Sequence, residues 1–104
     1  MALSAEAQEL RDRIIDEYDF SPAELAVLNE GLEAWDTAVE AQKAVEEHGV
    51  VIRDRFGQIV RNPAVGIAKD ARAQFMAAMK QLGVADPYGG QSTHGRGAQK
   101  ARRA

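Results

Sequence analysis

The sequence contains no cysteine, which excludes disulfides, cysteine-based zinc sites and thiol catalysis. Large apolar side chains are also few: the 104 residues include one Trp, three Phe and two Tyr, and much of the apolar content is Ala. Such a chain fits one domain, and alanine-rich helices bury little area at about 25 cal/mol per Å². We therefore expect neighbouring subunits to supply part of the stability.

Long hydrophobic runs are absent as well. No stretch approaches the roughly 20 apolar residues that a membrane span needs. The start, Met1 to Glu6, has neither the basic nor the apolar segment of a signal peptide. We therefore expect no membrane partner and a location in the cytosol of the cell that makes the protein.

A catalytic constellation is missing too. The two histidines, His48 and His94, have no recognisable metal-ligand spacing. No lysine follows a glycine-rich run with the spacing of a phosphate-binding loop. We therefore expect a protein that is not an enzyme and that holds no metal or cofactor.

The net charge of −3 is distributed unevenly along the chain. Residues 1–49 carry thirteen acidic side chains against three basic ones, a balance of −10. Residues 50–85 have a balance of +4, and residues 86–104 a balance of +3. This asymmetry fits a half that faces a polyanion and an acidic half turned elsewhere. It also fits two ordinary solvated surfaces.

Capping residues predict the first two helices. Ser4 can cap a helix that runs to about Tyr18. Ser21-Pro22-Ala23-Glu24 is a capping box with Pro at the first helical position. The second helix should run to about His48, which makes it roughly 40 Å long.

The second helix carries an apolar seam whose spacings alternate between three and four residues, as in helices packed against other helices. The seam consists of Leu25, Leu28, Leu32, Trp35 and Val39. A second side of this helix is rich in alanine. Either it lets a helix of a neighbouring subunit approach closely, or its alanines are simply good helix formers.

Residues 50–61 (VVIRDRFGQIVR) are β-branched and alternating, which predicts a hairpin with strands near 50–54 and 58–61. Gly57 should supply the positive φ angle of its turn. In an extended strand Val51, Arg53 and Arg55 would share one face. An isolated hairpin is marginal in water, so this one must pack on helices or join strands of a neighbour.

A third helix should begin at Asn62-Pro63 and run to about Leu82. Its expected buried stripe is Ala68, Phe75, Met79 and Leu82, with Lys69, Arg72 and Lys80 pointing elsewhere. Residues 86–104 are rich in Gly, Ser, Gln and basic residues, so we expect a disordered basic tail. The predicted fold is mainly α with a small β-hairpin, as one domain over residues 1–85 followed by the flexible tail 86–104.

Five short segments occur in an order that resembles phage terminase small subunits, of the group often encoded beside a phage HNH endonuclease. They are Glu33-Ala34-Trp35, Glu47-His48-Gly49-Val50-Val51, Arg55-Phe56-Gly57-Gln58-Ile59-Val60, Asn62-Pro63-Ala64 and Gln81-Leu82-Gly83-Val84. The resemblance covers about residues 20–87.

The resemblance implies a non-catalytic protein that binds the packaging site of double-stranded viral DNA in the host-cell cytoplasm. It also implies a homo-oligomeric ring of about eight to twelve subunits. Its partners would be the large terminase subunit, which carries the ATPase and nuclease and which it recruits and regulates, and an HNH endonuclease. The residues that we expect on DNA are Arg53, Arg55, Arg61, Lys69, Arg72, Arg96, Lys100, Arg102 and Arg103.

Two other functions stay open from the sequence. One is a phage assembly adaptor that does not bind DNA and whose basic half meets an acidic protein. The other is a small DNA-binding regulator, which would be a dimer and not a ring.

Overall fold

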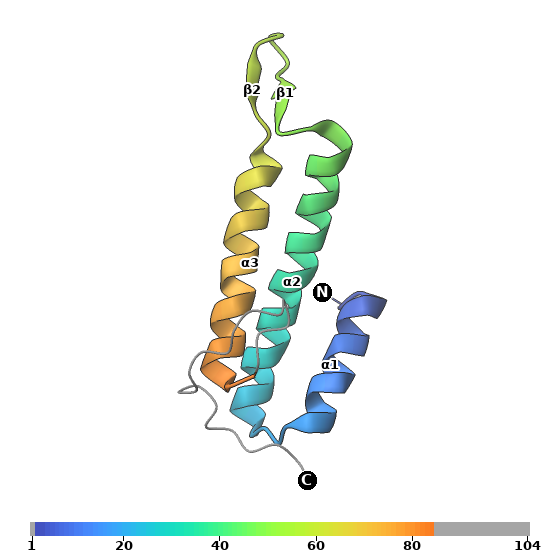
Figure 1. Cartoon of the computed structure of the whole chain (residues 1–104), viewed down its shortest axis with the longest axis vertical. Helices are drawn as coiled ribbons and strands as arrows, with labels where there is room; N and C mark the ends of the chain where they lie inside the picture. The colour runs from blue at the N-terminus through green and yellow to red at the C-terminus, as the bar shows by residue number, and fades with distance from the viewer. Residues whose placement is uncertain (1, 85–104) are drawn as a thin grey trace.

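The computed structural model describes residues 2–84, which form three helices and one β-hairpin (Figure 1). The elements are α1 (Ala5–Glu17), α2 (Pro22–His48), β1 (Val51–Arg53), β2 (Ile59–Arg61) and α3 (Pro63–Leu82). α2 and α3 lie side by side and antiparallel, α1 packs along the first half of α2, and the hairpin projects beyond the opposite end (Figure 1). The predicted mainly helical fold with a hairpin is confirmed. No helix within residues 2–84 is long and apolar enough to span a membrane.

The helices begin at the predicted caps. The Ser21 hydroxyl accepts from the Glu24 amide at 3.2 Å, and the Glu24 carboxylate accepts from the Ser21 amide at 2.8 Å. The Ser4 hydroxyl accepts from the Ala7 amide at 3.0 Å at the start of α1. Because these bonds satisfy amides that a helix start otherwise leaves without partners, the helix boundaries follow from local sequence.

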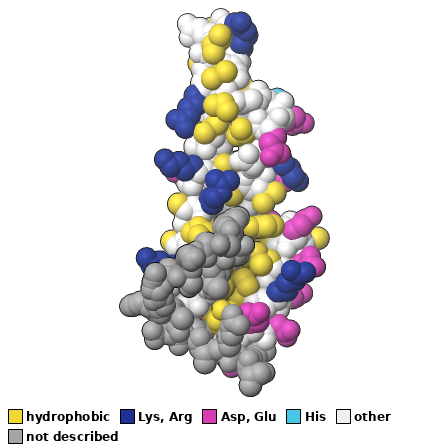
Figure 2. Space-filling model, viewed as in Figure 1, with side chains coloured by type: hydrophobic (Ala, Val, Ile, Leu, Met, Phe, Trp, Pro, Cys, Tyr) yellow, Lys and Arg dark blue, Asp and Glu magenta, His cyan; other side chains and the backbone are white. Residues whose placement is uncertain are grey.

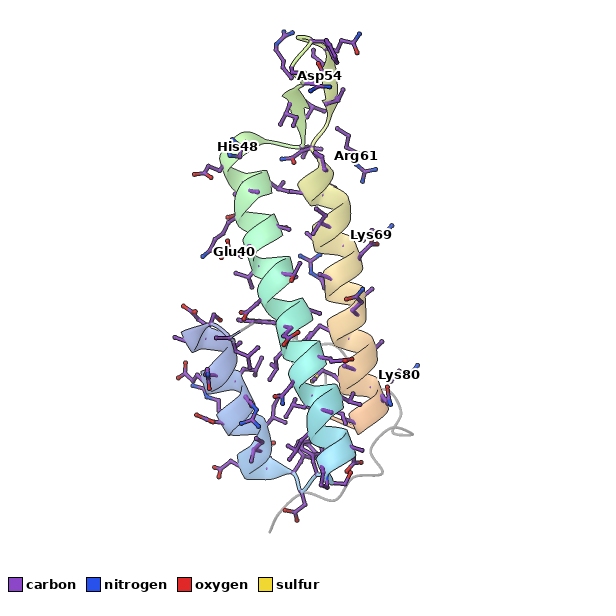
Figure 3. All side chains as sticks on the ribbon, turned by 180° about the vertical axis from the view of Figure 1, so that it is seen from behind. Glu40, His48, Asp54, Arg61, Lys69 and Lys80 are labelled. Carbon is purple, nitrogen blue, oxygen red and sulfur yellow. The ribbon has the colours of Figure 1, made fainter. Side chains whose placement is uncertain are left out.

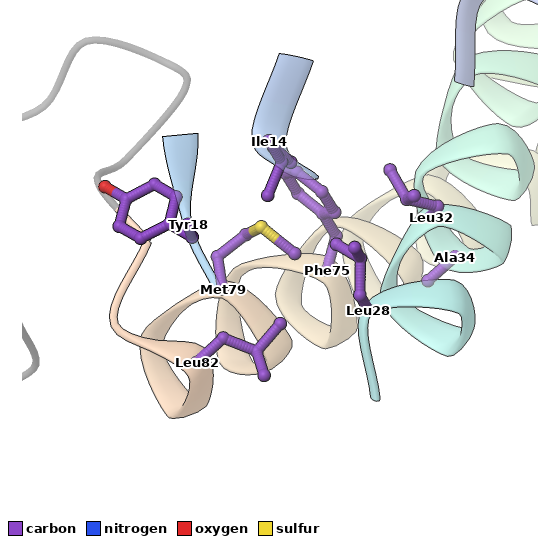
Figure 4. Packing of buried hydrophobic residues seen from close by; sticks show 8 residues of the cluster. All are labelled: Ile14, Tyr18, Leu28, Leu32, Ala34, Phe75, Met79 and Leu82. Atoms are coloured by element: carbon purple, nitrogen blue, oxygen red, sulfur yellow. The ribbon is translucent and has the colours of Figure 1, made fainter. Parts of the chain in front are cut away.

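The hydrophobic core lies at the end of the molecule that α1 covers, where all three helices meet (Figure 4). Phe75, Leu28, Leu32 and Met79 are its largest fully buried side chains. The whole cluster is Ile14, Tyr18, Leu28, Leu32, Ala34, Phe75, Met79 and Leu82. Of the predicted seam, Leu28 and Leu32 therefore lie in the core, and Leu25 and Trp35 pack against it. Val39 is partly exposed and belongs to neither core cluster of the described residues.

The alanine-rich side of α2 packs against α3 of the same chain. Ala41 forms a buried cluster with Ala64 and Ala68. Nearer the core, a Cβ atom built on Gly31 would lie 2.8 Å from the Cβ of Ala78, so the two helices almost touch there. The interpretation that this side of α2 receives a helix of a neighbouring subunit is wrong, since α3 already occupies it.

Polar contacts tie α1 to α2 in addition to the core. The Asp36 carboxylate accepts from the Ser4 amide at 2.8 Å and from the Ser4 hydroxyl at 2.5 Å. Further along α1, Arg11 Nε donates to Asn29 Oδ1 at 2.8 Å. α1 is therefore fixed in direction by its cap as well as by the burial of its apolar stripe.

Candidate nucleic-acid interface

The base of the hairpin is fixed by one buried side chain, that of Asn62, which is 6% exposed. Its Nδ2 donates to the Gly49 carbonyl at 2.8 Å, and its Oδ1 accepts from the Ala64 amide at 3.0 Å. Its backbone amide donates to the Val50 carbonyl at 2.7 Å. The same residue thus closes the hairpin and caps α3, which sets the direction of the hairpin relative to the helices.

The two strands put arginines and aliphatic side chains on one exposed face. The antiparallel pairs are Val51 with Arg61, Ile52 with Val60, and Arg53 with Ile59. Because paired residues point to the same side of a ribbon, Val51, Arg53, Ile59 and Arg61 share a face, and all four are exposed. Ile52 and Val60 form the opposite, partly buried face.

The hairpin tip is held by hydrogen bonds to Asp54. Its Oδ1 accepts from the amides of Phe56 at 2.8 Å and Gln58 at 3.0 Å. Its backbone carbonyl accepts from the Gly57 amide at 2.9 Å, and Gly57 has the predicted positive φ, at 80°. Arg53 Nη1 also donates to the Gly57 carbonyl at 2.7 Å. The tip therefore has a defined backbone although it is exposed.

Arg55 does not lie on the exposed face of β1. The prediction that Val51, Arg53 and Arg55 share one face is therefore wrong for Arg55. The strand ends at Arg53 because the Asp54 carboxylate turns the chain. Arg55 lies in the turn instead, with its guanidinium carbon 5.1 Å from the centre of the Phe56 ring. That separation suits a cation–π contact.

A basic stripe continues from the hairpin along α3. Lys69, Arg72 and Lys80 are exposed, as expected. Lys69 and Lys80 are eleven residues apart, about three helical turns, so they lie on the same side of α3. Figure 3 shows Arg61, Lys69 and Lys80 on the side of α3 that faces away from α2. We call Arg61, Lys69, Arg72 and Lys80 the α3 stripe.

Acidic and basic side chains occupy different sides of the molecule. In Figure 2 most basic side chains lie over the hairpin and α3, and the acidic ones lie mainly over α1 and α2. The ion pairs found within residues 2–84, Arg13 with Glu9 and His48 with Glu47, both lie on the acidic side. No residue of the α3 stripe is in an ion pair within this part of the chain, so its charges are available to an external anion.

The other candidate residues, namely metal ligands, His48 and the tail, add nothing to the candidate interface within the described residues. Residues 2–84 contain no group of three or more His, Asp or Glu side chains that could hold a metal ion. His48 is exposed at the end of α2 and lies 3.5 Å from Glu47. The predicted tail, with Arg96, Lys100, Arg102 and Arg103, lies outside the described residues.

The apolar surface of the hairpin was not predicted from the sequence. Phe56 is 74% exposed, and Val50, Val51 and Ile59 are exposed as well. The available signal was an aromatic residue inside a turn, directly before Gly57, where a core position is uncommon. The candidate interface is therefore basic and apolar together.

Comparison with known proteins identifies a family. A family model described as phage terminase, small subunit, matches residues 7–85, which include nearly all of α1 and every later element. No curated protein and no solved structure matches the chain significantly. The family predicted from the five sequence segments is thus confirmed.

Proposed function

The chain belongs to the phage terminase small-subunit family, and we propose that it binds double-stranded viral DNA at the packaging site. The family assigns the chain a role in phage genome packaging. Within that role it recruits and regulates the large terminase subunit and carries out no bond chemistry of its own. An HNH endonuclease is a further partner in this proposal.

The observation that carries the proposal is the one-sided α3 stripe, continued by Arg53 and Arg55 of the hairpin. Lys69 and Lys80 are separated by roughly 16 Å along the helix axis. A duplex carries one negative charge per about 1.7 Å of its axis, so the segment of α3 between these two lysines is long enough to lie along several phosphates. Most acidic side chains lie over α1 and α2, and only Asp54 and Asp70 lie on the hairpin and α3, so the net charge of this part of the molecule favours the approach of a polyanion.

Repetition of this surface strengthens the binding in the proposed assembly. A homo-oligomeric ring of about eight to twelve subunits places many copies of the α3 stripe around one DNA segment. Weak phosphate contacts then add through effective concentration. The acidic helices α1 and α2 form the ring wall or face the large subunit.

The hairpin favours a bound state over an isolated monomer. It projects past the helix ends, and its strands, of three residues each, are exposed on one face. Two short strands alone are marginal in water. A neighbouring subunit or bound DNA would therefore stabilise it.

The test is the salt dependence of binding to duplex DNA, with a matched pair of lysine variants. K69A removes one exposed charge from the α3 stripe, and K43A removes one exposed charge from α2 on the acidic side. If Lys69 contacts a phosphate, K69A weakens binding and lowers the slope of log K against log salt by about 0.9. K43A should leave both quantities unchanged.

Two further measurements separate the other functions. Light scattering gives the mass of the assembly: a closed ring supports the proposal, and a stable dimer supports a regulator. A protein that fails to retard duplex DNA even at low salt is an assembly adaptor. In the full chain, neutralising Arg96, Lys100, Arg102 and Arg103 should lower DNA affinity, and unchanged affinity would remove the tail from the interface.

A further inference from the structure

Phe56 is the most exposed large apolar side chain of the described residues, at the tip of the element that projects furthest from the helices. The backbone of the turn is fixed by the hydrogen bonds that the Phe56 and Gln58 amides donate to the Asp54 carboxylate. An aromatic ring on an ordered turn loses little conformational freedom when it binds, so this geometry suits insertion into a partner.

The surroundings of the ring are basic. The hairpin carries Arg53, Arg55 and Arg61, and its one acidic residue, Asp54, uses its carboxylate to hold the turn. The Arg55 guanidinium lies against the ring itself, 5.1 Å from its centre. A positive tip with an apolar point is complementary to a nucleic acid, which offers phosphates beside stacked bases.

We propose that Phe56 inserts as a wedge between two base pairs of the duplex, while Arg53 and Arg55 contact the flanking phosphates. The proposal deepens the DNA-binding function proposed above and rests on it. A two-stranded ribbon can lie in the minor groove of a duplex, the groove from which such wedges are inserted. Apolar side chains such as Phe, inserted between bases, partly unstack a step and kink the duplex by roughly 20–90°. On insertion Arg55 exchanges the ring face for a phosphate.

The wedge gives the protein a means of selecting DNA without reading base edges. Pyrimidine–purine steps unstack most easily, so the cost of insertion depends on the sequence at the insertion point. Sites with such a step at the right position would bind more tightly than sites without one. The hairpin then selects deformable sequence, and the α3 stripe supplies affinity that does not depend on sequence.

The experiment uses the full chain and a synthetic duplex of about 30 bp with one central TA step. The adenine of that step is replaced by 2-aminopurine, whose emission rises on unstacking, and dyes on the two ends report bending. Four proteins are compared: wild type, F56A, F56L, and I67A as the control. Ile67 is also an exposed apolar residue, but it lies on α3 away from the tip.

Wild type and I67A should raise the 2-aminopurine emission and shorten the distance between the dyes. F56A should lose both signals at saturating protein and bind roughly tenfold more weakly, whereas F56L should keep most of both. F56A complexes with the wild-type emission and bend would overturn the wedge while leaving DNA binding intact. A changed assembly mass for F56A would also overturn the wedge, because the Phe56 side chain would then contact another subunit. Failure of wild type to bind DNA would remove both the wedge and the proposed function.

Discussion

The side-chain amide of Asn62 donates a 2.8 Å hydrogen bond to the Gly49 carbonyl, across the base of the β-hairpin. The same side chain caps α3 through the Ala64 amide. One residue therefore joins the end of α2, the hairpin and the start of α3. The position of the hairpin, and with it the proposed DNA contact, depends on this residue.

Substitutions of Asn62 should separate its two roles. N62A removes the cap and the bond to Gly49, and should lower the free energy of unfolding by about 2 kcal/mol. N62D keeps an acceptor for the Ala64 amide but places a buried carboxylate oxygen against the Gly49 carbonyl, so the loss at neutral pH should be at least as large, about 2–3 kcal/mol. Urea unfolding measures both values. Equal stability of N62D and wild type would show that the bond across the hairpin base contributes nothing.

Gly31 and Gly66 should respond to alanine in opposite directions. In a helix, Ala is favoured over Gly by about 1 kcal/mol. At Gly66 a Cβ would meet nothing within 4 Å, so G66A should be stabilising by up to that amount. At Gly31 the new atom would lie 2.8 Å from the Ala78 Cβ, so G31A should be destabilising by about 1–2 kcal/mol.

The cause of the Gly31 effect can be checked with a double-mutant cycle. A78G removes the atom that the new methyl group would meet, so G31A/A78G should be more stable than the sum of the single changes predicts. Additive effects would place the cost of G31A elsewhere than at the approach of α2 to α3.

The helix ends could be predicted from the sequence because their chemistry is local. The bonds between Ser21 and Glu24 join residues three apart, and nothing distant is needed to form them. The same holds for the turn glycine, Gly57. The buried stripe of α3 followed from the helical period alone.

The features that could not be predicted from the sequence depend on contacts between segments far apart in the chain. Ala41 meets Ala64 and Ala68 only because α3 folds back along α2, so the alanines of α2 could not be assigned to a partner beforehand. The alternation of residues 50–61 predicts one face for Val51, Arg53 and Arg55, but it does not reveal the turn that the Asp54 carboxylate makes. The exposure of Phe56 follows from the hairpin projecting past both helices.

Asp36 should be needed to hold α1 in place. Its carboxylate accepts two bonds from Ser4, and bonds to charged groups contribute about 1.5–3 kcal/mol. D36A should lower the free energy of unfolding by an amount in that range and speed amide hydrogen exchange within α1. E33A, at an exposed carboxylate on the same helix, is the control and should change neither. Unchanged exchange in D36A would mean that the apolar stripe alone fixes α1.

Substitutions of Asp54 change the charge of the hairpin and the order of its turn, and these two changes should have opposite effects on DNA binding. Both D54A and D54N remove a negative charge from the hairpin, which by charge alone should strengthen binding to DNA. D54N keeps an oxygen that can accept from the Phe56 and Gln58 amides, whereas D54A does not. Those two amides should therefore exchange faster in D54A than in D54N.

If an ordered tip is needed for insertion, D54A should give a smaller 2-aminopurine signal than wild type despite its more positive hairpin, and D54N should not. Equal signals from the two variants would mean that the ordered turn is not required for the insertion of Phe56.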